Sequence, residues 1–274
     1  MRNLLFASLL LCISINSFSQ KQEEILEEAE RLYKSEMASW YGTDLFLEKL
    51  PQKREKAGAY LSYVTGDTAI CIFFSKGDKP KVVASFHFDS TYNTRTAVID
   101  DQDREPTAME AALISIREKA LQAYQSDTLF KSYKDMNPNF IPLNDEKGKR
   151  VYVLTGPANN GIVVLGNDYL ISFDKNENIS SKKRLHKNII TLPTKGENGE
   201  EISATVHSHL PETGDLITAT DICTLKLYGK FTTWEQHYVM SDKYVSIWDC
   251  KKNMLTVLTK KAWDKIAEKE KEKK

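Results

Sequence analysis

The chain has 274 residues, of which 41% are hydrophobic and 10% aromatic, enough apolar sequence to fill the core of one or two domains. Its 38 basic and 38 acidic residues balance, so no overall charge favours nucleic acid or an anionic membrane as a partner. This composition excludes a disordered chain or a fibre, and any partner must be recognised by local features.

Residues 1–19 are typical of a cleavable export signal. Arg2 supplies a positive start, residues 4–15 form an apolar run too short to cross a bilayer, and "SFS" offers a small-residue cleavage site. We therefore expect a secreted or periplasmic protein that begins at Gln20 and has no stable membrane insertion after cleavage. Cys12 follows three leucines instead of a small residue, which argues against lipid attachment.

Export leaves three cysteines in the mature chain, and an odd number allows at most one disulfide. Cys71, Cys223 and Cys250 each lie among apolar neighbours, so we expect buried free thiols at these positions. The chain is therefore not a disulfide-framework protein.

The region 20–145 is predicted to combine helices with a small antiparallel sheet. Residues 21–39 place apolar side chains close to helical spacing, with acidic residues concentrated in the first turns. From Ala57 the pattern changes to short β runs separated by turn signals, which predicts an antiparallel meander. These β runs are residues 59–64, 69–74 and 82–88.

A second helix is predicted over residues 104–124. Thr107 and Glu110 have the spacing of a capping box at its start. The residues that we expect on its buried stripe are Ala111, Ile114, Leu121 and Tyr124.

The segment 134–149 is rich in turn-forming and polar residues, which predicts a linker. It would join the first region to a second one, residues 146–274. The strands predicted there are 150–155, 161–166, 169–173, 201–209, 237–241, 244–248 and 254–259, with helices at 219–229 and from Lys260 and a polar excursion over 174–200. We therefore expect an α+β fold: an N-terminal helix, a meander and a helix, then a mixed β-sheet flanked by helices.

Two histidines one residue apart, His207 and His209, end the strand predicted over 201–209. Side chains alternate along a strand, so both imidazoles lie on one face. Asp221 follows in the first turn of the next helix. Two histidines and one carboxylate are a common zinc ligand set that leaves a fourth position for water, and a metal-activated water can hydrolyse amides.

The same residues also have a structural explanation. Thr218 and Asp221 have the spacing of a capping box, so Asp221 can serve the helix alone. One His-x-His among five histidines also arises easily by chance. Residue spacing by itself therefore does not distinguish a metal site from an ordinary strand followed by a capped helix.

The stretch "HSHLPETGDLITATD" resembles the signature of the JAMM (MPN-domain, JAB-type) metalloproteases, which read His-Ser/Thr-His-Pro, a loop and Ser-x-x-Asp. His207 and His209 match the first element, Pro211 stands near the family proline, and Thr218 with Asp221 stands for Ser-x-x-Asp. The resemblance covers about residues 151–260. It implies zinc on His207, His209 and Asp221, an oxyanion supported by Thr218, and a peptide or isopeptide substrate in a partner protein.

The chain departs from the family pattern at three points. Leu210 is an extra residue before the proline, and threonine replaces serine at Thr218. The family's catalytic glutamate precedes an early glycine-containing strand, for which we take "NNGIVVLG", but the region "TGPANNG" carries no acid. A base would have to come from Glu212, Glu110 or Asp168, each of which also has a structural explanation.

Two further functions remain open at this point. The missing glutamate favours a catalytically inactive JAMM-fold module that binds or scaffolds a partner in the periplasm or at the cell surface. The motif can also be coincidental, in an exported α+β binding protein without metal.

Of the other three histidines, His87 and His186 are predicted to lie outside the site, and the place of His237 stays open. His87 is expected to be half-buried in a strand, and His186, within the basic stretch 180–188, to be solvated. His237 opens a strand and approaches the motif only if that strand adjoins it. The sequence has no Walker loop, dinucleotide fingerprint or Gly-x-Ser-x-Gly elbow, which disfavours nucleotide chemistry and serine hydrolysis.

Overall fold

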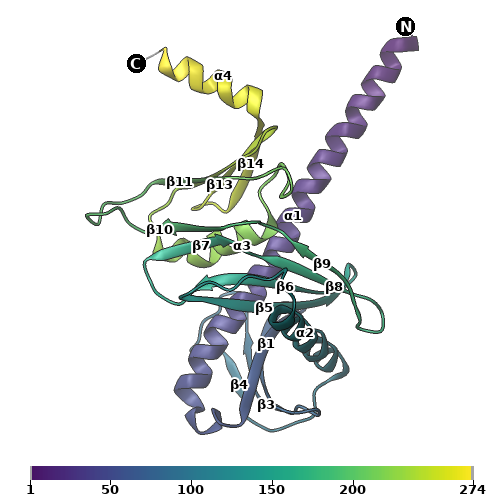
Figure 1. The fold of residues 1–274 in the computed structure, drawn as a ribbon, viewed down its shortest axis with the longest axis vertical. Coiled ribbons are helices and arrows are strands. Elements are labelled where there is room, and N and C mark those ends of the chain that lie inside the picture. Colours follow the sequence, from purple (N-terminus) through teal and green to yellow (C-terminus); the bar gives the residue numbers. More distant parts are fainter. Residues whose placement is uncertain (1, 273–274) are drawn as a thin grey trace.

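The computed structural model describes the backbone of residues 2–272 and the side chains from Phe18 to residue 272. Over this part of the chain it has four α-helices and four sheets, in which antiparallel pairing predominates (Figure 1). The predicted α+β class is confirmed. None of the helices, over the described residues, combines the length and apolar character needed to cross a membrane.

Helix α1, Arg2–Lys49, runs the length of the molecule (Figure 1). It includes the helix predicted over 21–39 and extends beyond it in both directions. The side chains of residues 1–17, on which the export-signal prediction depends, lie outside the described residues. A Cβ added at Gly42 would lie 2.6 Å from the Cβ of Cys71, so glycine lets this helix pack closely on the sheet beneath it.

The predicted meander is confirmed as a four-stranded sheet in the order β1-β2-β3-β4. Its strands are β1 Ala57–Thr65, β2 Thr68–Ser75, β3 Val82–Phe88 and the short β4 Val98–Asp100, and a 3-10 turn η1, Pro51–Lys53, connects α1 to it. Phe46 of α1 stacks on Phe73 of β2, with ring centroids 3.9 Å apart. Aromatic and aliphatic packing therefore joins α1 to one face of this sheet.

Helix α2, Ala108–Ser126, has the predicted capping box between Thr107 and Glu110. Of the expected buried stripe, Ile114 is buried, whereas Ala111 is exposed, so that part of the prediction was wrong. The buried apolar residues of α2 are Leu113, Ile114, Ile116 and Ala120. Glu110 is buried on the same helix, and its carboxylate accepts two hydrogen bonds of 2.7 Å from Arg104.

The predicted linker over 134–149 was wrong, because most of it forms a β-hairpin. The sheet here has the order β5-β6-β8-β9. Its strands are β5 Met136–Asp145, β6 Gly148–Pro157, β8 Tyr169–Phe173 and β9 Ile179–Arg184. Pro138 and Pro142, which suggested a linker, lie on the edge strand β5, where a missing N–H costs little. One core cluster contains Leu61 of β1, Ile116 of α2 and Val151 of β6. The two regions predicted on either side of the linker therefore share a core.

The remaining elements surround the predicted motif. They are β7 Ile162–Gly166, β10 Ile189–Pro193, β11 Ala204–Ser208, α3 Ala219–Tyr228, the 3-10 turn η2 Gly229–Phe231, β12 Gln236–Met240, β13 Tyr244–Asp249, β14 Met254–Thr259 and α4 Lys260–Lys271. β7 pairs with β10, and β11 runs parallel to β12 in the sheet β11-β12-β13-β14. The range 174–200, expected to be a polar excursion, instead contains β9 and β10. Cys71, Cys223 and Cys250 are free, as predicted. Cys71 and Cys223 are buried as expected, whereas Cys250 is partly exposed.

Candidate metal centre

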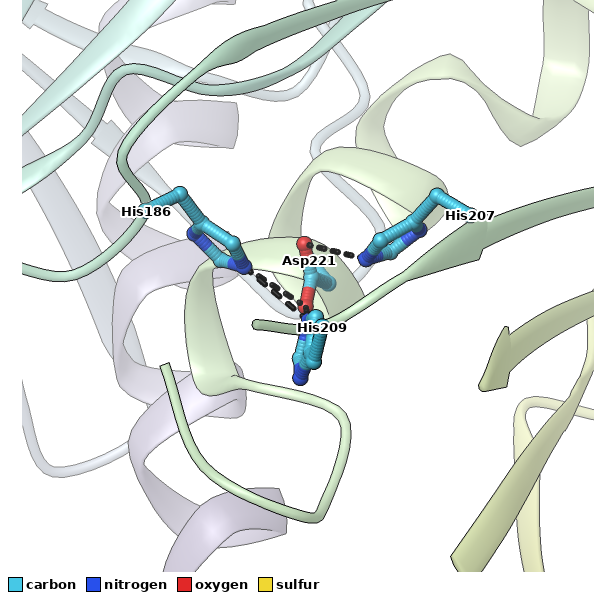
Figure 2. A group of neighbouring side chains, drawn as sticks. All are labelled: His186, His207, His209 and Asp221. Atoms are coloured by element: carbon cyan, nitrogen blue, oxygen red, sulfur yellow. Dashed lines mark hydrogen bonds and ion pairs between the residues drawn. The ribbon is translucent and has the colours of Figure 1, made fainter. Parts of the chain in front are cut away.

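Four side chains converge beside the start of α3: His186, His207, His209 and Asp221 (Figure 2). Each offers one ligand atom, and these atoms all lie within 4.8 Å of one another. All four residues are at most 7% exposed. The predicted trio of His207, His209 and Asp221 is therefore brought together, with one more histidine beside it.

Three separate segments position these ligands. His207 lies on β11, and His209 lies just beyond it, where its backbone N–H donates to Met240 of β12 at 2.8 Å and continues the pairing. Asp221 is the third residue of the capped helix α3. His186 lies in the loop between β9 and β10, and its imidazole points toward the carboxylate of Asp221 (Figure 2).

The distances suit a small metal ion. The Nε2 atoms of His209 and His186 lie 3.3 and 3.5 Å from Oδ2 of Asp221, and 3.1 Å from each other. Nε2 of His207 lies 3.8 Å from Oδ1 of Asp221. Tetrahedral zinc with bonds of about 2.0–2.1 Å separates its ligand atoms by roughly 3.3 Å. These four separations lie between 3.1 and 3.8 Å, and all the ligand atoms lie within 4.8 Å of one another, so the cluster is slightly larger than an occupied zinc site.

Two ligand atoms that face this cluster have no hydrogen-bond partner among the described residues. These are Nε2 of His207 and Oδ1 of Asp221, and both are buried. Buried polar atoms of native proteins are nearly always satisfied. A bound cation would satisfy both atoms at once.

Asp168 holds the fourth histidine in place. Its Oδ1 accepts hydrogen bonds from Nδ1 of His186 at 2.7 Å and from the backbone N–H of the same residue at 3.0 Å, and its Oδ2 accepts one from Thr220. Burial opposes a positive charge on His186, but the carboxylates of Asp221 and Asp168 outweigh it and raise its pKa to about 11. A carboxylate behind a metal-binding histidine is a common supporting arrangement, which fixes the ring orientation.

A second chain of hydrogen bonds supports His207. Its Nδ1 lies 2.8 Å from Nε2 of His237, whose Nδ1 lies 2.7 Å from the hydroxyl of Thr205. Burial is the main cause that lowers the pKa of His207 to about 4 and that of His237 to about 3, so both rings are neutral at pH 7. A proton on Nδ1 of His207 leaves Nε2 free as a ligand. Strand β12, which carries His237, pairs with β11 and therefore does adjoin the motif.

Burial opposes the charge on Asp221 as well, yet the facing histidines His186 and His207 hold its pKa well below the usual value. Asp221 is therefore anionic and could serve as a metal ligand. The prediction that His186 is solvated was wrong, because the residue is 4% exposed. Its signal in the sequence is weak: a basic stretch surrounds it, and only the adjacent Leu185 suggests a buried position.

The capping box predicted at α3 is present together with the cluster. The hydroxyl of Thr218 donates to Oδ2 of Asp221 at 2.7 Å and accepts from its backbone N–H at 3.1 Å. Thr218 thus has a structural role as the cap of α3 beside Asp221, and its predicted role at an oxyanion stays a prediction.

The residues considered as a catalytic base lie in different surroundings. Glu212 is exposed, and its Oε1 lies 3.8 Å from Nζ of Lys187. Glu110 belongs to the cap of α2, while Asp168 lies directly behind His186. The segment 155–161 is where the family would place its glutamate. It precedes the start of β7, whereas the other end of β7, at Gly166, lies beside His186.

His87 lies outside the cluster. It is half-buried in β3, as predicted, and its Nε2 lies 3.0 Å from the hydroxyl of Ser85.

The fold and the site define an α+β protein with a buried group of three histidines and one aspartate that could hold a metal ion. Comparisons with models of known families, with curated proteins and with solved structures find no match for this chain.

Proposed function

We propose that this chain is an exported zinc-binding protein of the JAMM-like class. In this proposal His186, His207, His209 and Asp221 all ligate the metal. The observation that carries the proposal is the convergence of four buried ligand atoms within 4.8 Å. The order of β11, the loop and the capped helix α3, which prompted the family resemblance, supports the assignment of the class.

The fourth ligand favours a structural role for the metal over hydrolysis. Structural zinc sites are usually closed by four protein ligands, whereas catalytic sites keep one position for water. With His186 as fourth protein ligand, a four-coordinate metal would have no position left for water, and Asp168 holds the His186 ring toward the cluster with a 2.7 Å hydrogen bond. The absence of an acid from "TGPANNG" agrees with a site that has no catalytic base.

A structural metal would join three segments that Asp168 already connects in part, through its hydrogen bonds to His186 and Thr220. It would connect the β9–β10 loop to the end of β11 and the start of α3, all of which meet at the cluster. We therefore propose a binding or scaffold module of the periplasm or cell surface, with zinc as a permanent part of its fold and a peptide or protein as partner.

Metal analysis of the mature protein tests the proposal. We expect one zinc per chain for the wild type and for His87→Ala, a control that changes a histidine outside the cluster. His207→Ala is expected to lose the metal. Replacement of zinc by cobalt is expected to give the intense visible bands of a four-coordinate site. A wild-type protein purified without stoichiometric metal, and unable to take up zinc or cobalt, would refute the proposal.

A metallopeptidase is the second candidate, because His207, His209 and Asp221 match the three ligands of the family. Hydrolysis requires a free coordination position, which would arise if the loop carrying His186 moved away. A peptide library incubated with wild type and His186→Ala tests this candidate. Zinc-dependent cleavage that His209→Ala abolishes would establish a peptidase, and no cleavage by either protein would support the closed structural site.

A further inference from the structure

A cavity of about 270 Å³ lies where strands β1 and β5 come together. Each of these strands is at the edge of its own sheet, and within the described residues the two are not paired with each other. Helices α1 and α2 pack beside them and supply the other walls (Figure 1). None of the lining residues belongs to the metal cluster, so the inference below does not depend on the proposed function.

The largest part of the lining is apolar. Leu113 of α2 is 2% exposed, and Met109, about one turn earlier on the same helix, packs against the same core cluster. On β5, Pro142 is buried and Leu143 is partly exposed. Val64, near the end of β1, is 37% exposed. Apolar side chains from three different elements therefore offer a ligand a surface that excludes water.

The hydroxyl groups of the lining are already hydrogen-bonded within the protein. Ser35 donates to the backbone carbonyl of Ser62 at 3.0 Å, and Tyr63 donates to Oε1 of Glu110 at 2.9 Å. The amide of Asn144, the remaining neutral polar side chain of the lining, is exposed. The interior of the cavity therefore offers apolar contacts and few free hydrogen-bonding groups.

Two of the four charged side chains of the lining belong to an ion-pair network. Arg31 donates to Glu146 at 2.5 Å and to Glu28 at 3.3 Å. Asp145 accepts two hydrogen bonds from Arg150, at 2.6 and 2.9 Å. Both side chains are therefore engaged with protein partners, which a ligand would have to displace.

Lys34 is the charged side chain of the lining that has no close partner among the described residues. Its nearest carboxylate oxygen, Oε1 of Glu30, lies 3.8 Å from Nζ, beyond hydrogen-bond distance. The other oxygen of Glu30 bonds to Lys226. The side chain of Lys34 is 44% exposed, so a ligand can reach its ammonium group. An ammonium group beside an apolar cavity complements a ligand with an anionic head and an apolar tail.

We propose that this cavity binds a medium-chain fatty acid, whose carboxylate pairs with Lys34 and whose tail contacts Leu113, Met109 and Pro142. A water molecule takes about 30 Å³ of the liquid and a methylene group is of similar size, so 270 Å³ holds roughly nine carbons. Decanoate therefore fills the cavity with its tail and leaves its carboxylate at the surface. One available ammonium group suits this single carboxylate better than a nucleotide or another ligand with several negative charges.

Calorimetric titration of the delipidated mature protein with saturated fatty acids tests the proposal. The probes are hexanoate, octanoate, decanoate, dodecanoate and tetradecanoate, each below its critical micelle concentration. Each methylene that enters the cavity is expected to tighten binding about fourfold. This gain is expected to stop near decanoate, because the end of a longer tail remains in water.

Ligands with the same tail test the head group. Decanoate is expected to bind about two- to fivefold more tightly than decanol, as an exposed ion pair contributes, and decylammonium is expected to bind more weakly than both. Lys34→Met is expected to remove the preference for decanoate over decanol. The matched control is Lys79→Met, which changes an exposed lysine between β2 and β3, outside the lining, and is expected to keep the preference.

Two further variants locate the tail. Met109→Trp fills part of the cavity, and Val64→Glu adds a carboxylate to its lining, so each is expected to weaken decanoate binding about tenfold or more. Val64 is 37% exposed, so its replacement keeps the test valid even if Met109→Trp does not fold.

No saturable binding of any of the fatty acids to the wild type would overturn the inference. An affinity that keeps rising through tetradecanoate would overturn it as well, because it indicates adsorption to the surface instead of a cavity of fixed size. The same holds for decanol or decylammonium binding as tightly as decanoate, and for decanoate binding that Lys34→Met and Val64→Glu leave unchanged.

Discussion

If the cluster binds zinc as proposed, removal of the metal is expected to lower the free energy of unfolding by about 2–6 kcal/mol. Two buried atoms, Nε2 of His207 and Oδ1 of Asp221, lose their only available partner, and each unsatisfied buried polar atom costs about 1–3 kcal/mol. For a chain of this size one kcal/mol changes Tm by about 2–4 °C. A loss near the middle of this range, about 4 kcal/mol, therefore lowers Tm by roughly 8–16 °C.

Thermal unfolding followed by circular dichroism measures this change, in protein saturated with zinc and in protein treated with excess chelator. The double variant His207→Ala, His209→Ala serves as the control, because it lacks two ligands and its Tm should not respond to the chelator. If the wild type and the double variant respond equally, the chelator acts elsewhere and the reasoning from the two unsatisfied atoms is wrong. An unchanged Tm of a wild type that has demonstrably lost its zinc would refute it as well.

Further predictions concern the supporting residues and the pH dependence. Asp168→Asn is expected to weaken zinc binding about 10- to 100-fold, since its carboxylate orients His186, and competition with a chromophoric chelator measures the loss. His237→Ala should have a similar effect through His207, with unaltered affinity counting against either role. For Glu110, burial opposes ionisation, but the hydrogen bonds from Arg104 outweigh it and lower the pKa from 4.5 to about 2. A pKa that is lower in the folded state stabilises the protein above pH 4.5, and this contribution is lost as the pH falls from 4.5 to about 2. The difference in unfolding free energy between wild type and Glu110→Gln, from urea unfolding, should therefore shrink over that window, and a constant difference would contradict the assignment.

The parts of the fold that were predicted correctly are those with local signals in the sequence. The capping box of Thr107 and Glu110 lies within four consecutive residues, and it begins α2 as expected. The strands β1 to β3 alternate with clear turn residues, so their antiparallel order follows from short connections. Such features depend on neighbours along the chain, which the sequence displays directly.

The elements that were missed depend on contacts between distant residues. Pro138 and Pro142 are compatible with β5 only because this strand lies at the edge of its sheet, and the sequence does not show which strand is at the edge. Strand β9, Ile179–Arg184, is mostly polar and exposed, so it lacks an alternating apolar pattern. It forms by antiparallel pairing with β8, with one register shift between Ser172 and Phe173.

Of the four candidate ligands, three have a local signal in the sequence and one has none. His207 and His209 share a strand face and Asp221 begins a capped helix, so three ligands could be predicted from local spacing. His186 precedes His209 by 23 residues and lies in a loop whose place is set by Asp168. No local pattern connects these residues, and the ligand that changes the proposed chemistry was therefore the one that the sequence did not reveal.

Asp221 shows why a structural and a metal-binding interpretation of the motif need not compete. Its Oδ2 accepts the capping hydrogen bond from the backbone N–H of Thr218 at 3.0 Å, while its Oδ1 remains without a partner among the described residues and faces His207. One oxygen can therefore cap α3 while the carboxylate still has a lone pair for a cation. The same carboxylate fixes the start of α3 and takes part in the cluster, so occupancy of the metal centre and the stability of α3 are expected to be coupled.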